Sequence, residues 1–135
     1  MRDIDCHIIA ETVSSLFKEA CFNLPQDVLS ALKHARENEI SPAARGVLET
    51  IIENATIAST DGIPLCQDTG IAVVFLELGQ EVHITGGDLY SAVQNGVRRA
   101  YDEGYLRKSL VDRPFSSRIN TGDNTPAIIH GYRTW

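Results

Sequence analysis

A loop of polar and reactive side chains stands immediately before the most apolar run of the chain. Pro64 to Gly70 reads Pro-Leu-Cys-Gln-Asp-Thr-Gly, so a thiol at Cys66, an amide at Gln67 and a carboxylate at Asp68 follow one another. Thiolates bind soft metals, and a carboxylate beside an amide can exchange a proton and orient a substrate carboxylate. A plainer interpretation stays open, because a half-buried loop thiol often acts as a small apolar group and Asp-Thr-Gly suits an Asx turn.

A second polar cluster lies near the end of the chain. Asn120, Thr121, Gly122 and Asp123 are followed by Asn-Thr-Pro, and Arg107 precedes them in a Leu-Arg-Lys-Ser segment. Arginine can hold a carboxylate through two parallel hydrogen bonds, although a solvated surface arginine is the commoner arrangement. Asp123 is equally ambiguous, since the same residues make good turns. His130 follows this cluster, and we expect a structural role for it.

The elements that must position these clusters begin with helices. Apolar residues recur at helical spacing from about His7 to Ala20, and a second helix opens at Pro25 and ends near Asn38. Ser41 and Pro42 form an N-cap and first-turn pair for a third helix that runs to about Ser59. Residues 1–60 are therefore predicted to be helical.

The pattern changes after the Cys66 loop. Residues 71–78 are β-branched, aromatic and apolar, which predicts a strand buried on both faces, and residues 81–85 form a short partner strand. The segment Thr85–Asp88 resembles a capping box ahead of a fourth helix, which stops at Gly104. Residues 105–124 are rich in turn formers, and residues 127–130 form a plausible last strand. The order of elements favours an α+β or mixed α/β fold.

Composition limits the function. A chain of 135 residues fits one modest domain. Its net charge of -6 argues against electrostatic binding to the phosphates of nucleic acid. The longest apolar run is far too short to span a membrane, so we expect no membrane partner and a cytoplasmic location. Cys6, Cys21 and Cys66 form no disulfide framework, which fits a reducing compartment. Cys6 and Cys21 lie on the apolar flank of the first helix, where a core role is expected.

The two clusters together resemble the class I, iron-sulfur-dependent fumarate hydratases. The resemblance rests on Pro64–Gly70 with the apolar strand after it, the Leu106–Ser109 segment, and Asn120–Pro126, in this order and at this separation. It covers nearly the whole chain up to about His130 and is similar to the amino-terminal part of the alpha subunit or alpha region. The L(+)-tartrate dehydratases are close relatives of that family, and the Thr-Gly-Asp-Asn-Thr-Pro-Ala sequence is more similar to the fumarases.

The resemblance implies a hydro-lyase that interconverts fumarate and L-malate. It implies that Cys66 is one of three cysteines holding a [4Fe-4S] cluster, with an open iron acting as a Lewis acid on the small dicarboxylate substrate. Gln67, Asp68 and Arg107 would hold the substrate carboxylates, and Asp68 would also take part in proton transfer. Asn120, Thr121, Gly122 and Asp123 would line the same pocket.

The resemblance also implies parts that this sequence does not contain. The family needs two further cluster cysteines and a glycine-rich substrate loop beyond this point, and residues 131–135 are expected to depart from its pattern. Residues 1–135 then form an amino-terminal portion with a helical part at 1–60, a motif-bearing part at 61–130 and an off-pattern tail, as a truncated, frame-shifted or deliberately cut product. We expect marginal stability, a beta subunit or C-terminal region as partner, and a homo-oligomer. The alternative is a non-catalytic assembly or binding fragment.

Overall fold

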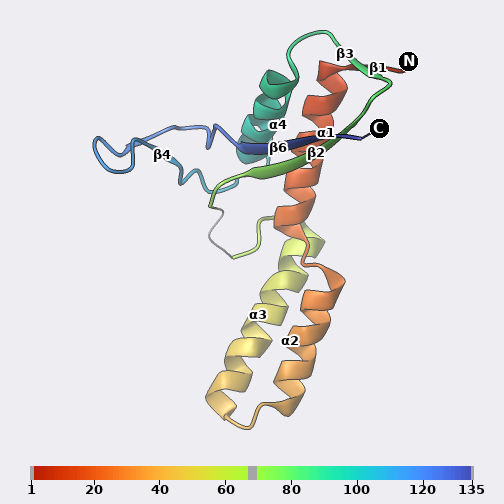
Figure 1. Ribbon diagram of the computed structural model, residues 1–135. Helices are drawn as coiled ribbons and strands as arrows, with labels where there is room; N and C mark the ends of the chain where they lie inside the picture. Colours follow the sequence, from red (N-terminus) through yellow and green to blue (C-terminus); the bar gives the residue numbers. More distant parts are fainter. Residues whose placement is uncertain (1, 67–69, 135) are drawn as a thin grey trace. The chain divides into compact units, whose positions relative to one another are not determined.

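The computed structural model of the chain describes residues 2–66 and 70–134 (Figure 1). These residues divide into two compact units, one formed by Met1–Lys18 with Asp68–Trp135 and the other by Glu19–Gln67. The chain runs through helices first and then through strands with an intervening helix. This order confirms the mixed helical and strand architecture expected from the sequence.

The second unit is built on a helical hairpin. Helix α2 (Gln26–Asn38) and helix α3 (Pro42–Asp61) lie side by side, and a short core of Ala55, Ala58 and Leu65 forms beside them (Figure 1). The Ser41 hydroxyl accepts a hydrogen bond from the Ala44 amide at 3.5 Å, so the predicted N-cap is confirmed. Gly62 ends α3 in the left-handed conformation that glycine adopts without strain.

The core of the first unit lies between two helices. Helix α1 (Cys6–Phe22) contributes Ala10 and Val13, and helix α4 (Leu89–Glu103) contributes the fully buried Val93, Val97 and Tyr101. The backbones approach closely at Gly96, where an added Cβ would lie 2.6 Å from the Ala10 carbonyl oxygen. The α1–α4 contact therefore depends on the absence of a side chain at this position.

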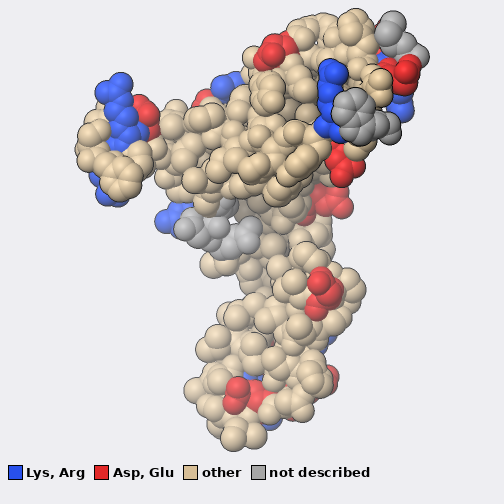
Figure 2. All heavy atoms as spheres, viewed as in Figure 1, with Lys and Arg blue, Asp and Glu red and all other residues tan. Residues whose placement is uncertain are grey.

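Strand β2 (Val73–Gly79) runs parallel to strand β6 (Ile128–Thr134). The prediction that this strand is buried on both faces is wrong: Val73, Phe75 and Glu77 are exposed, and Phe75 is 72% exposed. His130 stacks on Phe75 with a centroid separation of 5.2 Å, which gives this histidine the expected structural contact. The face seen in Figure 2 carries few charged side chains over these strands. An apolar run predicts a strand, but it does not predict whether one or both faces of that strand are buried.

The other small sheet contains a strand that sequence reasoning missed. Strand β1 (Arg2–Asp5) pairs in parallel with strand β3 (Val82–Thr85), so residues 2–5 are not helical and β3 does not pair with β2. A polar segment of four residues carries no periodic signal, and only backbone pairing makes it a strand. Because Thr85 lies in this ladder, the N-cap of α4 is Asp88, whose carboxylate accepts from the Ser91 amide at 2.7 Å.

The turn-rich segment contains a short hairpin, and the last strand is longer than expected. Strands β4 (Val111–Asp112) and β5 (Ile119–Asn120) pair antiparallel, and basic side chains gather at the loop between them, where Arg113 and Arg118 lie (Figure 2). Residues 131–134, predicted to be an off-pattern tail, continue β6 opposite residues 76–79. In the part of the chain that the structure describes, no helix is long and apolar enough to cross a membrane.

Substitution of Gly96 tests the α1–α4 contact. In Gly96→Ala the new methyl would meet the Ala10 carbonyl and the Val13 side chain, so we expect the free energy of unfolding to fall by about 1–3 kcal/mol. The matched control is Gly46→Ala in α3, where an added Cβ meets nothing within 4 Å and should stabilise by about 0.5–1 kcal/mol. Urea unfolding followed by circular dichroism measures both. Equal effects of the two substitutions would contradict the close contact.

Candidate functional site

A buried asparagine joins the two motifs that the sequence singles out. Asn124 is 0% exposed, and its Nδ2 donates to the Gly70 carbonyl at 3.0 Å. Its Oδ1 accepts from the Leu110 amide at 2.7 Å. Gly70 is the last residue of the Pro64–Gly70 motif, and Leu110 lies three positions after Arg107. One side chain therefore connects three segments that carry candidate site residues.

Asp123 is held by the chain itself. Arg98 Nε donates to one carboxylate oxygen at 2.7 Å, and the backbone amide and hydroxyl of Thr125 donate to the other at 2.9 and 2.7 Å. Burial alone would raise the pKa of Asp123, but the hydrogen bonds from Arg98 and Thr125 outweigh it and lower the pKa to about 2. The carboxylate is thus ionised at neutral pH, and its oxygens already accept three bonds within the chain.

The neighbouring residues form a tight turn against the segment after Arg107. Asn120 Nδ2 donates to the Lys108 carbonyl at 2.9 Å, its Oδ1 accepts from the Gly122 amide at 2.7 Å, and the Thr121 amide donates to the Leu110 carbonyl at 3.0 Å. The Thr121 hydroxyl oxygen is buried and has no hydrogen-bond partner among residues 2–66 and 70–134. The structure therefore brings Asn120–Asp123 together with the Arg107 segment.

Cys66 belongs to the second unit and is exposed, which disagrees with the plainer interpretation of a half-buried loop thiol. Its backbone amide donates to Asn54 Oδ1 at 3.0 Å, so the loop is anchored to α3. Gln67 and Asp68 lie outside the described residues. Arg107 is exposed, while its neighbour Leu106 is buried in the first unit.

The other two cysteines lie where a core role was expected. Cys6 is buried, and Cys21 is half-buried with a pKa that burial raises, which disfavours its thiolate. The described residues contain no group of three or more histidine, cysteine or acidic side chains able to hold a metal ion. Of the three cysteines, Cys66 is thus the one whose exposure suits a metal ligand.

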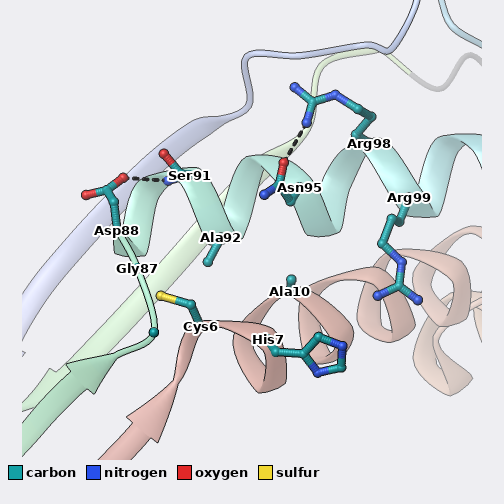
Figure 3. A pocket seen from close by; sticks show the side chains of 11 residues that line it. Cys6, His7, Ala10, Gly87, Asp88, Ser91, Ala92, Asn95, Arg98 and Arg99 are labelled. Atoms are coloured by element: carbon teal, nitrogen blue, oxygen red, sulfur yellow. Dashed lines mark hydrogen bonds between the residues drawn. The ribbon is translucent and has the colours of Figure 1, made fainter.

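A cavity of about 460 Å³ opens in the first unit between α1 and α4 (Figure 3). The Cys6 sulfur points toward Gly87 at one end, and Arg98 and Arg99 lie farther along α4. Arg98 lines this cavity and also holds Asp123. No sequence pattern predicts the cavity, because its lining residues come from two segments far apart in the chain.

Three residues that position the site escaped sequence reasoning. Asn124 stands in the sequence as one member of the Asn120–Pro126 cluster, and no motif marks Arg98 or Gln94. The Gln94 side chain pairs with the backbone of Ala127 through bonds of 3.2 and 2.7 Å. Gln94 is half-buried and is not one of the buried residues of α4, so no local pattern singles it out.

Known proteins with similar sequences agree with the motifs. A family model described as fumarate hydratase (Fumerase) matches residues 10–134. The chain belongs to this family. The matched range extends to residue 134.

Individual relatives carry two different names. The chain is 37% identical over 124 residues to the "Putative L(+)-tartrate dehydratase subunit alpha" of Methanocaldococcus jannaschii, which covers 89% of this chain and 43% of that protein. It is 35% identical over 119 residues to the aerobic class I fumarate hydratase of Escherichia coli K12, covering 86% and 21%. The L(+)-tartrate dehydratase subunit alpha of the same organism is 28% identical, covering 87% and 38%. The chain therefore spans less than half the length of these relatives, and the family match does not choose between the two names.

The low pKa of Asp123 predicts an acid-sensitive fold. A carboxylate whose pKa is lower in the folded state stabilises that state above its unfolded pKa, near 3.8, and this contribution disappears as the pH falls toward 2. We expect a loss of about 1–2 kcal/mol between pH 4 and pH 2, allowing for screening at a partly exposed pair. Denaturant unfolding across this range measures it.

Two variants test whether Asp123 causes this loss of stability. Asp123→Asn should remove this acid-dependent loss, and Thr125→Val, which deletes one donor, should raise the pKa of Asp123 in a carbon-13 titration. An unchanged acid profile in Asp123→Asn would contradict the assignment.

Proposed function

We propose that the chain is part of a [4Fe-4S] hydro-lyase that interconverts fumarate and L-malate. The family match and the names of the relatives support this proposal. The observation that carries it is the Asn124 side chain, whose bonds to Gly70 and Leu110 connect the two motifs on which the resemblance rests. These bonds connect Gly70, at the end of the first motif, with the segment that follows Arg107, and all of these residues belong to the first unit.

Cys66 is the residue proposed to hold the cluster. Its thiol is exposed and its backbone is anchored by Asn54, while Cys6 is buried and the raised pKa of Cys21 disfavours a thiolate. The residues present therefore fit one ligand of the cluster, and further polypeptide would supply the other two. When bound, the cluster would supply a Lewis-acidic iron for the substrate hydroxyl or carboxylate. A reducing, cytoplasmic setting would keep the thiols available.

The other residues are assigned to the substrate. Gln67, Asp68 and Arg107 would hold its carboxylates, and Asp68 would exchange a proton during loss or addition of water. The buried hydroxyl of Thr121, which has no partner in the described part of the chain, supports a place in the lining, because a substrate oxygen would satisfy it. Asn120 and Gly122 form the turn that presents Thr121.

Asp123 receives a different role. Its carboxylate is ionised, and its two oxygens already accept bonds from Arg98 and Thr125. We assign it the task of orienting the turn instead of binding the substrate.

L(+)-tartrate dehydration is the second candidate. Two of the relatives carry that name, and both tartrate and malate are 2-hydroxy dicarboxylates from which water can be removed. The names of these relatives also support a beta subunit as partner, since each is a subunit alpha. We propose that the isolated chain is inactive and requires additional polypeptide, and that the assembly is a homo-oligomer of such units.

Cluster binding is tested by anaerobic reconstitution of the 135-residue chain with iron and sulfide. We expect a visible absorption band from thiolate-bound iron that Cys66→Ser abolishes and Cys21→Ser retains, since the Cys21 thiolate is disfavoured by burial. A band that survives Cys66→Ser would contradict the ligand assignment. The absence of a band in the unmodified chain would show that Cys66 does not retain iron without the polypeptide that supplies the other two ligands.

Substrate binding is tested by nuclear magnetic resonance titration with fumarate, L-malate and L(+)-tartrate. We expect shifts at Arg107 and Thr121, and about tenfold weaker binding in Arg107→Lys, because lysine cannot form the bidentate pair. The matched control is Arg45→Lys, an arginine of α3 that should leave the affinity unchanged. Equal loss in both variants would indicate an effect of the arginine-to-lysine exchange that does not depend on position, and it would contradict the role of Arg107. The ligand with the highest affinity identifies the substrate.

A further inference from the structure

We infer that Asn124 is a positioning residue that sets the place of Arg107 relative to the turn of Asn120–Asp123. The consequence for substrate binding rests on the function proposed above, whereas the geometric statement stands on the first unit alone. Asn124 itself binds no substrate in this proposal. It acts through the backbone of the two segments that it bonds.

The chemistry of the bonds requires an amide. Asn124 donates from Nδ2 to the Gly70 carbonyl at 3.0 Å and accepts at Oδ1 from the Leu110 amide at 2.7 Å. A carboxylate at this position would keep an acceptor for Leu110 but would place a second acceptor against the Gly70 carbonyl. Since the side chain is fully buried, water cannot replace a lost partner without entering the core.

The backbone around Arg107 is held on both sides. Before it, Leu106 is buried and its amide donates to the Tyr101 carbonyl at 3.0 Å. After it, the Lys108 carbonyl accepts from Asn120, and Leu110 is bonded to both Asn124 and Thr121. Of these points, the bond to Asn124 is the one that also reaches the Gly70 segment. Its loss would leave the Leu110 amide without its acceptor and would cut the link to the Gly70 segment, while the bonds of Asn120 and Thr121 and the attachment of Leu106 to α4 would remain.

The conformation of Asn124 allows a clean variant. Its φ of 58° lies in the left-handed region, which asparagine and glycine adopt readily and alanine does not. Asn124→Gly therefore removes the amide without straining the backbone. Arg118→Gly is the matched control, because Arg118 also has a left-handed φ, of 50°, and lies exposed in the loop between β4 and β5.

The experiment measures amide hydrogen exchange by nuclear magnetic resonance in the 135-residue chain. In Asn124→Gly we expect the exchange of the Leu110 amide to rise at least tenfold relative to that of Val97 in α4. In Asn124→Asp the Leu110 amide should stay protected, while the carbonyl carbon of Gly70 should shift because its donor is lost. Arg118→Gly should change neither signal. Separate effects on the Leu110 amide and on the Gly70 carbonyl, with Val97 unchanged, distinguish positioning by Asn124 from a general loss of stability.

The same samples test the consequence for Arg107. In titrations with L-malate and L(+)-tartrate, Asn124→Gly should weaken binding at least tenfold, and adding Arg107→Lys to it should cause little further loss. Leu110 exchange that rises no more than Val97 exchange would overturn the inference, as would an equal effect of Arg107→Lys in both backgrounds. If the unmodified chain binds neither ligand, the proposed function fails for the isolated chain, and the exchange data still decide the geometric role of Asn124.

Discussion

The arrangement of the candidate site depends on one buried amide. The side chain of Asn124 satisfies a carbonyl and an N–H from two segments that lie outside regular secondary structure. A buried polar group left without a partner costs about 1–3 kcal/mol. Separating the segments of Gly70, Leu110 and Asn124 would leave such groups without hydrogen bonds, so the three segments stabilise one another. Gln94 acts in the same way. Its side-chain amide bonds both the N–H and the carbonyl of Ala127, as the backbone of a neighbouring strand would. Side-chain amides thus take the place of sheet hydrogen bonds around this site.

Local signals in the sequence were sufficient for the helices. Ser41 with Pro42 marks the start of α3, and Gly104 marks the end of α4, because caps act on the residues beside them. The motifs were sufficient for the family, since the residue types and their order are specific. All of these signals are local, because each depends on a few consecutive side chains and on no residue far away in the sequence.

Pairings between distant segments could not be predicted in this way. Nothing in Arg2–Asp5 indicates that it lies against Val82–Thr85, and nothing in β2 indicates that its partner is β6 and that one face stays open. The roles of Asn124 and Arg98 likewise depend on residues many positions away. The sequence could name the residues of the candidate site, but the bonds that orient them follow from the tertiary structure.

The close approach at Gly96 also restricts how this fold can diverge. The nearest atom to an added Cβ is a backbone oxygen of Ala10, which no substitution on α1 can remove, and the next is the side chain of Val13. A larger residue at position 96 therefore cannot be accommodated by a single compensating change. Among relatives that keep the two helices in this register, glycine should persist at this position even as the surrounding apolar residues drift. Where it has been replaced, the helices must have separated or slid along each other.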